Sequence, residues 1–288
     1  MQIIDAHIHF WDLKNKINSW VLRSSNPNLQ KDYLPDNLVN VSTNELIGVV
    51  HVEAHDSAIP TITEVTWLKA VMKNHKLQYK HIAYADITLP FAEFKKVIDG
   101  LASYHDVLGI RHILSYTTKF NYNHNESDLS NHKNIAKNLE YIALNNLIFD
   151  CQAYSSQMKN LLPAIIKSNV TTIIDHILLP AWDEQNDEDC KLWQDTIMEL
   201  AKHTNIYLKL SGLNMFQAME NYDFVVDFCL DNFPQERLMY GSNYPVSCNN
   251  NYNDWINCLL SKNIEPRKSS QIFYENAKKL FKFDLSLS

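Results

Sequence analysis

Two histidines stand two residues apart in the first apolar run of the chain, at residues 2–10. In a β-strand alternate side chains share a face, so we expect Asp5, His7 and His9 to point one way and Ala6 with the isoleucines to point the other. Two imidazoles on one face can ligate a metal or, without one, polarise a substrate and its attacking water. Because a chain with 12 histidines produces such pairs by chance, the pair gains meaning only from its context.

Polar residues also gather at the ends of the other apolar runs. Buried charges are costly unless they are paired, so ionisable residues inside apolar strands indicate partners or function. Together with the first strand, the residues of this kind are Asp5, His7, His9, His51, Glu53, Asp86, Arg111, Gln152, His176, Lys209, Ser211 and Asn243. The subset that we expect to meet in one functional site is His7, His9, Arg111, His176 and Asn243.

Eight β-branched or apolar runs alternate with segments of helical period, and this order must position those residues. The expected strands are 2–10, 45–54, 81–89, 107–114, 147–154, 171–179, 206–213 and 237–245. The expected helices are 58–78, 91–104, 128–145, 155–168, 187–204, 220–232, 250–262 and 269–281. Such alternation predicts a parallel sheet, and eight units predict a (β/α)8 barrel of the TIM type over residues 1–288, an α/β fold closed by a C-terminal helix. The active site of such a barrel lies at the carboxyl ends of its strands.

An open doubly wound sheet is the alternative fold. It is disfavoured because Phe10-Trp11-Asp12 stands where a glycine-rich phosphate loop is expected after the first strand. Residues 11–44, rich in Asn, Ser and Lys, are predicted to form a long first loop over the barrel mouth, and loops of this length are usually functional.

Several polar residues are better explained by structure than by chemistry. For Asp5, Asp150 and Lys209 we expect an ion pair or hydrogen bond across the barrel floor. His112 follows Arg111 and is expected to face a helix. The histidines for which we expect surface positions are His55, His105, His124 and His132.

Composition indicates a soluble protein that acts on small molecules. The net charge of −7 and the pI near 5.9 give no positive surface for nucleic acid or anionic membrane. Five cysteines without a CxxC pair suggest reduced thiols, and no signal-peptide pattern or membrane-length apolar run is present in the sequence. A cytoplasmic location is therefore expected, while the pattern favours no particular oligomeric state.

Five segments in order resemble one known family. IDAHIHFWD at the start, GIRH at 109–112, IIDH at 173–176, KLSGL at 209–213 and RLMYGSNYPV at 237–246 are similar to the amidohydrolase superfamily. The resemblance is to its amidohydrolase-2 group of lactonases, which includes L-fuconolactone hydrolase and 2-pyrone-4,6-dicarboxylate lactonase. It implies a distorted barrel with His7, His9 and His176 in the site, and with Arg111 and Gln152 as substrate-contacting or site-lining groups. We expect Glu53 and Trp11 to contact the substrate as well.

The resemblance also implies an acid at position 243, where this chain has Asn243. An amide cannot take a proton near neutral pH, so it cannot be the general base that the family's aspartate provides. Three outcomes are open: Asn243 orients a water while a histidine acts as base, Glu53 or Asp86 supplies the base, or the barrel binds without hydrolysing.

The metal content is open in the same way. His7, His9 and His176 can hold one divalent ion, with zinc the best candidate, but an amide at 243 weakens such a site, and relatives include metal-independent enzymes.

The favoured function is hydrolysis of a small carbonyl ester, a sugar-acid or dicarboxylate lactone. The alternatives are a zinc-dependent decarboxylase or amide hydrolase, and a catalytically silent binding barrel.

Overall fold

The predicted alternation of strands and helices is present in the computed structural model, which describes residues 1–54, 56, 58–119, 123–180, 187–213, 222–247, 251–262 and 264–284. The strands are β1 (Gln2–Ile8), β2 (Glu45–Val52), β3 (Gln78–Tyr84), β4 (Val107–Ile113), β5 (Ile148–Gln152), β6 (Thr172–Ile174), β7 (Ile206–Leu210) and β8 (Leu238–Tyr240). The α-helices are α1 (Pro35–Val41), α2 (Thr61–Met72), α3 (Phe91–Leu101), α4 (Ile135–Leu144), α5 (Ser155–Ser168), α6 (Asp187–Ala201), α7 (Tyr222–Asn232), α8 (Asn253–Leu260), α9 (Pro266–Ser270) and α10 (Asn276–Leu280). None of the described helices is long and apolar enough to cross a membrane.

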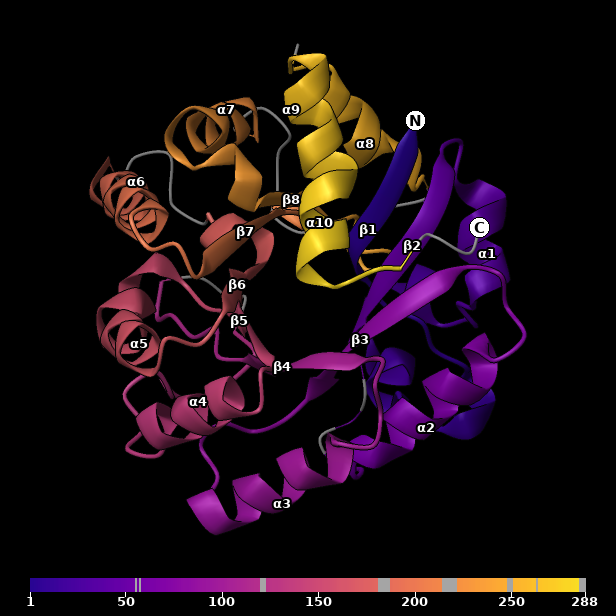
Figure 1. Ribbon diagram of the computed structural model, residues 1–288, viewed down its shortest axis with the longest axis horizontal. Helices are drawn as coiled ribbons and strands as arrows, with labels where there is room; N and C mark the ends of the chain where they lie inside the picture. Colours follow the sequence, from indigo (N-terminus) through magenta and orange to yellow (C-terminus); the bar gives the residue numbers. More distant parts are fainter. Residues whose placement is uncertain are drawn as a thin grey trace.

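The strands form one parallel sheet in the order β1 to β8, with the helices outside it (Figure 1). Beyond β8 the chain returns to the first strand: the Asn243 amide donates to the His7 carbonyl at 2.8 Å, and the His9 amide donates to the Tyr244 carbonyl at 2.7 Å. These bonds bring β1 and β8 together. The predicted (β/α)8 barrel is confirmed, and the doubly wound alternative is wrong.

Two apolar layers stabilise the barrel. The larger lies between the strands and the surrounding helices, where Leu68 of α2 and Leu139 of α4 are completely buried. The smaller lies inside the barrel and contains Ile4, Ile148 and Phe281. Phe281 follows α10, so the C-terminal helix covers the amino ends of the strands, as Figure 1 shows, and leaves the carboxyl ends for a site.

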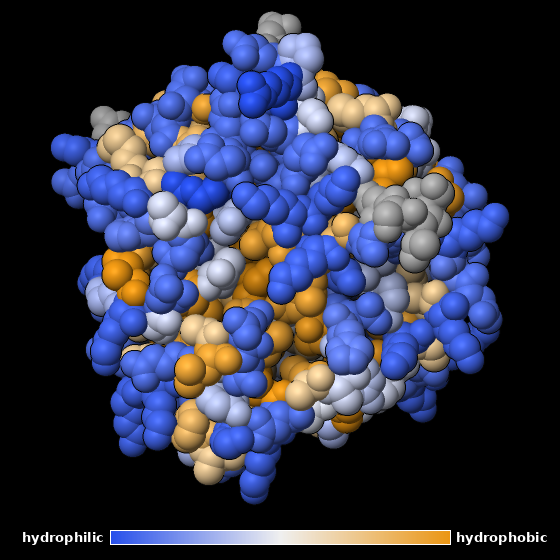
Figure 2. All heavy atoms as spheres, in the orientation of Figure 1, coloured by the Kyte–Doolittle hydropathy of each residue, from blue (hydrophilic) through white to orange (hydrophobic). Residues whose placement is uncertain are grey.

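The face that carries α10 is hollowed beside that helix. Figure 2 shows hydrophobic side chains in this hollow, surrounded by largely hydrophilic helices. The hollow, of about 700 Å³, is lined by Leu108, Leu147 and Ile148 among others, residues at the amino ends of β4 and β5. It therefore lies at the end of the barrel opposite to the carboxyl ends of the strands.

The predicted boundaries differ from the structure where the chain leaves regular geometry. The strand expected at 171–179 ends at Ile174, because a tight turn follows at Asp175–Leu178 and the backbone is left-handed from His176 to Leu179. The expected first loop, 11–44, contains three short 3-10 turns and α1. An antiparallel bridge between Trp11 and Tyr33 ties this segment to the end of β1.

Candidate active site

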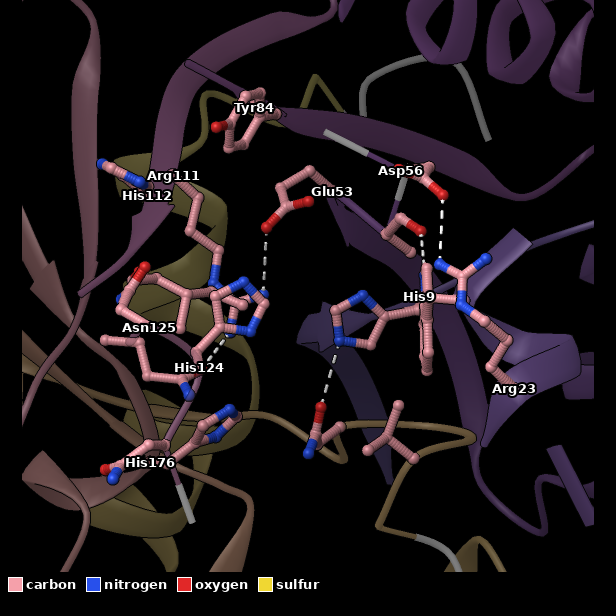
Figure 3. Close-up of a pocket in the computed structure, with 17 residues that line it drawn as sticks. His9, Arg23, Glu53, Asp56, Tyr84, Arg111, His112, His124, Asn125 and His176 are labelled. Atoms are coloured by element: carbon pink, nitrogen blue, oxygen red, sulfur yellow. Dashed lines mark hydrogen bonds and ion pairs between the residues drawn. The ribbon is translucent and has the colours of Figure 1, made fainter. Parts of the chain in front are cut away.

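A cavity of about 530 Å³ opens at the carboxyl ends of the strands (Figure 3). Six of the residues predicted from the sequence line it: His9, Glu53, Arg111, Gln152, His176 and Asn243. They come from the ends of six different strands, as the barrel topology requires. His7 lies next to them, with its ring centroid 4.6 Å from that of His176. The structure thus brings together nearly all of the predicted site.

The first strand is bulged, and this changes the expected alternation. Its register with β2 shifts between Asp5 and Ile8. His7 and His9 approach each other, but Asp5 accepts hydrogen bonds from the Ser242 amide at 2.9 Å and from the Tyr252 hydroxyl at 2.9 Å. The expectation that Asp5 shares a face with the two histidines is therefore wrong, because a bulge reverses side-chain parity. Asp5 makes structural hydrogen bonds, but they link β1 to the chain after β8 and do not cross the barrel floor as expected.

The tautomers of the two first-strand histidines follow from their partners. His9 Nδ1 lies 2.8 Å from the Val52 carbonyl, which only accepts, so Nδ1 carries the proton and Nε2 a lone pair. His7 Nδ1 lies 3.2 Å from Asp175 Oδ1 and 3.3 Å from Lys209 Nζ. The carboxylate can only accept and the ammonium can only donate, so Nδ1 either donates to Asp175 or accepts from Lys209. We assign the proton to Nδ1 and the bond to Asp175, since the Lys209 ammonium is already engaged by carboxylates. His7 Nε2 then also carries a lone pair.

Three lone pairs consequently converge at one point. His7 Nε2 and His9 Nε2 lie 3.2 Å apart, and Asn243 Oδ1 lies 3.1 Å from His9 Nε2. The Asn243 amide is held in this orientation because its Nδ2 donates to Ser247 Oγ at 2.6 Å. Acceptors that face one another without a proton repel, so this arrangement attracts a cation or a water that donates to them.

The imidazoles of the site are neutral at physiological pH. Burial lowers the pKa of His9 to about 4 and that of His176 to about 3, and it also lowers the pKa of His7 well below its usual range. His176 Nδ1 lies 2.9 Å from Ser211 Oγ. Neutral imidazoles can ligate a metal or accept a proton, whereas imidazolium ions can do neither.

A buried group of charges lies beneath the histidines. Lys209 Nζ is 2.5 Å from Asp150 Oδ2 and 3.0 Å from Asp175 Oδ1, and Arg111 Nε is 3.1 Å from Asp175 Oδ2. Burial opposes the ionisation of Asp175, but Lys209, His7 and Arg111 together hold its pKa well below the ordinary value. The ion pair predicted for Asp150 and Lys209 is present. Asp175, which the sequence marked only as the neighbour of His176, is the residue that joins the group to His7.

Arg111 also reaches the cavity wall. Its Nη1 lies 3.5 Å from Glu53 Oε1, and its Nη2 donates to Gln152 Oε1. Figure 3 shows Glu53 directed from the end of β2 toward the guanidinium. A carboxylate and a guanidinium thus share one wall, with Gln152 beside them. Asp86, the other acid considered as a base, is not among the cavity-lining residues and lies 3.5 Å from His112 Nδ1.

His176 depends on an unusual piece of backbone. From His176 to Leu179 four consecutive buried residues have φ values between 46° and 59°. Left-handed geometry costs about 1–2 kcal/mol for each residue with a Cβ, so surrounding contacts must hold this turn in place. One such contact is close packing with Gly212, whose own φ is 70°. A Cβ added to Gly212 would lie 2.3 Å from His176 Nδ1.

Gly212→Ala is therefore expected to displace the His176 imidazole and lower kcat by about a hundredfold, since an error of about 1 Å in a catalytic group has effects of this size. Steady-state kinetics on a substrate that the protein turns over measures this loss in kcat. Gly100→Ala is the matched control, because a Cβ on that α3 glycine has no neighbour within 4 Å. Equal activity of the two variants would show that turnover does not depend on the position of the His176 imidazole.

Three predictions about the rim of the site need correction. Trp11 is completely buried and donates to the Lys31 carbonyl at 2.7 Å, so it does not line the cavity; Trp20, from the same loop, does. His112 and His124, expected on a helix-facing and a surface position, both line the cavity. The long first loop and the loop after β4 place Trp20 and His124 at the cavity, and the alternation of side chains along a strand cannot predict the course of a loop. His55 lies outside the described residues.

A second buried group, His51, Glu64 and His81, brings three possible metal ligands together. His51 Nδ1 accepts the Phe10 amide at 3.1 Å, so His51 Nε2 carries the proton and is no ligand. Glu64 Oε1 instead accepts the Ala54 amide at 2.9 Å. This group fixes the chain just after His9 and just after Glu53, and it supports the site rather than forming one.

Comparison with known proteins identifies the family and the fold. The model of a family described as "Amidohydrolase" matches residues 4–283. An uncharacterised protein of Sinorhizobium fredii is 26% identical over 257 residues, 85% of each chain, and an L-fucono-1,5-lactonase of Burkholderia multivorans is 23% identical over 286 residues, 93% of this chain and 90% of that protein. A solved amidohydrolase from Burkholderia multivorans with bound zinc shares the fold with a TM-score of 0.80 at 20% identity, covering 99% of this chain and all of that one.

Proposed function

The chain belongs to the amidohydrolase family, and on that premise we propose that it hydrolyses a small neutral lactone carrying several hydroxyl groups, such as a sugar-acid lactone. The observation that carries the proposal is the meeting of Glu53, Arg111 and the neutral imidazoles of His9 and His176 in one cavity. These groups supply a proton acceptor, a stabiliser for a developing oxyanion and a polar floor, which are the requirements for water attack on an ester carbonyl. The L-fucono-1,5-lactonase relatives support the same reaction class.

The charge of the cavity favours a neutral lactone over a dicarboxylate. Its arginines each face a carboxylate: Arg111 Nη1 lies 3.5 Å from Glu53, and Arg23 Nη2 lies 3.3 Å from Asp56. A substrate with two carboxylates would need an excess of cations, which these described lining residues do not provide. Neutral hydrogen-bonding groups are abundant instead, and they suit hydroxyl groups: Tyr84, Asn123, Asn125 and Gln152 line the cavity.

The roles follow from the placement of the groups. Glu53 takes a proton from a water that attacks the ring carbonyl carbon, and Arg111 stabilises the oxyanion of the tetrahedral intermediate. When the ring C–O bond breaks, Glu53 returns the proton to the leaving oxygen, so lactone and water give one hydroxy acid. Asn243 accepts from and orients the water beside the imidazoles, which is a role that needs no basicity.

The residues present fit a divalent metal, although with a neutral ligand set. The donors that would hold it are His7 Nε2, His9 Nε2 and Asn243 Oδ1, which converge without a proton between them. A bound metal would polarise the carbonyl and lower the pKa of a water. A second combination, His7, Asp175 and His176, is less suitable because Lys209 and Arg111 already engage the carboxylate.

Asn243→Asp is accordingly expected to raise the affinity for zinc at least tenfold, because it adds a negative charge to three neutral donors. Competition with a chromophoric chelator measures the affinity without reference to activity. The matched control is Asn125→Asp, which adds the same charge at the rim of the cavity. If all three proteins retain zinc equally, the donor set is not the one named above.

The test of the proposed function is a hydrolysis screen of purified protein against aldonolactones and unsaturated dicarboxylate lactones, with metal content measured on the same sample. We expect turnover of at least one aldonolactone and at least a hundredfold lower kcat/KM for the dicarboxylates. The reverse preference would overturn the charge argument. Absence of turnover on both sets, with and without added zinc, would overturn lactone hydrolysis.

A further inference from the structure

We propose that Trp193, on the outer helix α6, is a positioning residue for the active site that acts through His176. Trp193 is 1% exposed, and its Nε1 donates to the Ile177 carbonyl at 2.8 Å. Ile177 lies in the middle of the left-handed turn that carries His176. This bond connects the helix layer to the strained backbone of the site.

The turn needs such a contact because its residues do not favour it. Ile177, a β-branched residue, has φ 54° and ψ 38°, a conformation that is a genuine outlier for its type. The Leu179 amide donates to the His176 carbonyl at 3.0 Å and closes the turn. Strained backbone persists only where the surroundings over-determine it. The indole N–H supplies a fixed donor at the β-branched residue of the turn.

Trp193 is itself held rigidly. Its ring packs against that of Phe228 on α7, with centroids 5.3 Å apart. On the inner side, Ser211 Oγ lies 2.9 Å from His176 Nδ1 and Gly212 leaves no room for the ring to move toward β7. His176 is therefore fixed from two sides, by β7 through its ring and by α6 through its backbone. Loss of the α6 contact should loosen the turn and let the imidazole drift from the cavity.

Trp193→Phe tests this by removing the donor and keeping the aromatic packing. The matched control is Trp255→Phe: Trp255 is also buried, and its Nε1 donates to the Leu210 carbonyl at 3.0 Å, at the end of the regular strand β7. We expect W193F to lower kcat tenfold or more with KM changed less than twofold, and W255F to keep kcat within about threefold. Equal losses in the two variants would overturn the proposal, since they would report lost stability alone.

A double-mutant cycle shows whether the effect passes through His176. In a His176→Ala background, Trp193→Phe is expected to have less than twofold further effect on kcat, because residues that act through one another are not additive. If Trp193→Phe still lowers kcat tenfold in the His176→Ala background, Trp193 does not act through His176 and the proposal is overturned.

The measurements of kcat and KM rest on the proposed lactonase function, whereas hydrogen exchange of the backbone amides does not. W193F is expected to speed exchange of the Leu179 amide at least tenfold more than W255F does, because that amide closes the turn. Should W193F not fold, Phe228→Leu is the second variant: it keeps the indole hydrogen bond and removes the ring that packs against Trp193. We expect it to raise the exchange rate of the Leu179 amide at least threefold. Unchanged Leu179 exchange in the variant that folds would overturn the proposal even if no substrate is found.

Discussion

Glu53→Gln is expected to lower kcat on a lactone substrate by about a thousandfold, within the range of 10²–10⁴ that general-base catalysis supplies. Glutamine keeps the shape and the polar contact with Arg111 Nη1, 3.5 Å away, but it takes no proton near neutral pH. Glu53 is 6% exposed and lines the cavity, and a glutamine of the same shape keeps that part of the cavity wall in place. Steady-state kinetics of the purified variant, with KM compared to kcat, measures the effect.

Asp86→Asn is the matched control for that experiment. Asp86 is the other acid that the sequence offers as a base, and its carboxylate caps the Thr88 amide at 2.7 Å rather than lining the cavity. We expect Asp86→Asn to keep kcat within about threefold. If Glu53→Gln also keeps full activity, the base is one of the neutral imidazoles, and His176→Ala becomes the variant that should abolish turnover.

Much of the fold was accessible from the sequence because hydrophobic pattern determines it. The helix predicted at 155–168 coincides with α5, and all eight predicted strands overlap the observed ones. Strands buried on both faces appear as apolar runs, and most of these runs end in a polar residue that the barrel directs to its mouth. His9, Arg111 and Gln152 were found in this way.

The errors occurred where local backbone geometry overrides the pattern. Strict alternation predicts Asp5 on one face with His7 and His9, and the bulge that reverses this has no signal in the sequence. The pattern predicts a continuing strand at the left-handed turn of His176, since Ile177 and Leu178 are apolar residues of the kind found in strands. Both departures are stabilised by distant partners, Tyr252 for the bulge and Trp193 for the turn, which only the folded chain brings near.

The second large effect is expected for Lys209→Met, which should reduce the free energy of unfolding by about 3–5 kcal/mol, the range for breaking a buried ion pair. The Lys209 side chain is fully buried and its Nζ contacts Asp150 at 2.5 Å and Asp175 at 3.0 Å. Methionine fills the space but leaves the two buried carboxylates with Arg111 as their remaining charged partner among the contacts named above. Chemical denaturation at pH 7 measures the loss. Lys95→Met is the control, because the Lys95 pair with Asp99 is exposed and should change stability little.

The pH dependence of Lys209→Met separates lost charge pairing from lost packing. Burial and the neighbouring Asp175 already raise the pKa of Asp150, and without the ammonium this pKa must rise further. A carboxyl whose folded pKa is raised above its unfolded value costs stability above that value and not below it. The deficit of the variant relative to the wild type should therefore shrink as the pH falls from 7 toward about 4. Adding Asp150→Asn should recover part of the loss at pH 7, whereas a deficit that is constant with pH and unaffected by Asp150→Asn would mean that Lys209 stabilises the barrel through its hydrocarbon chain.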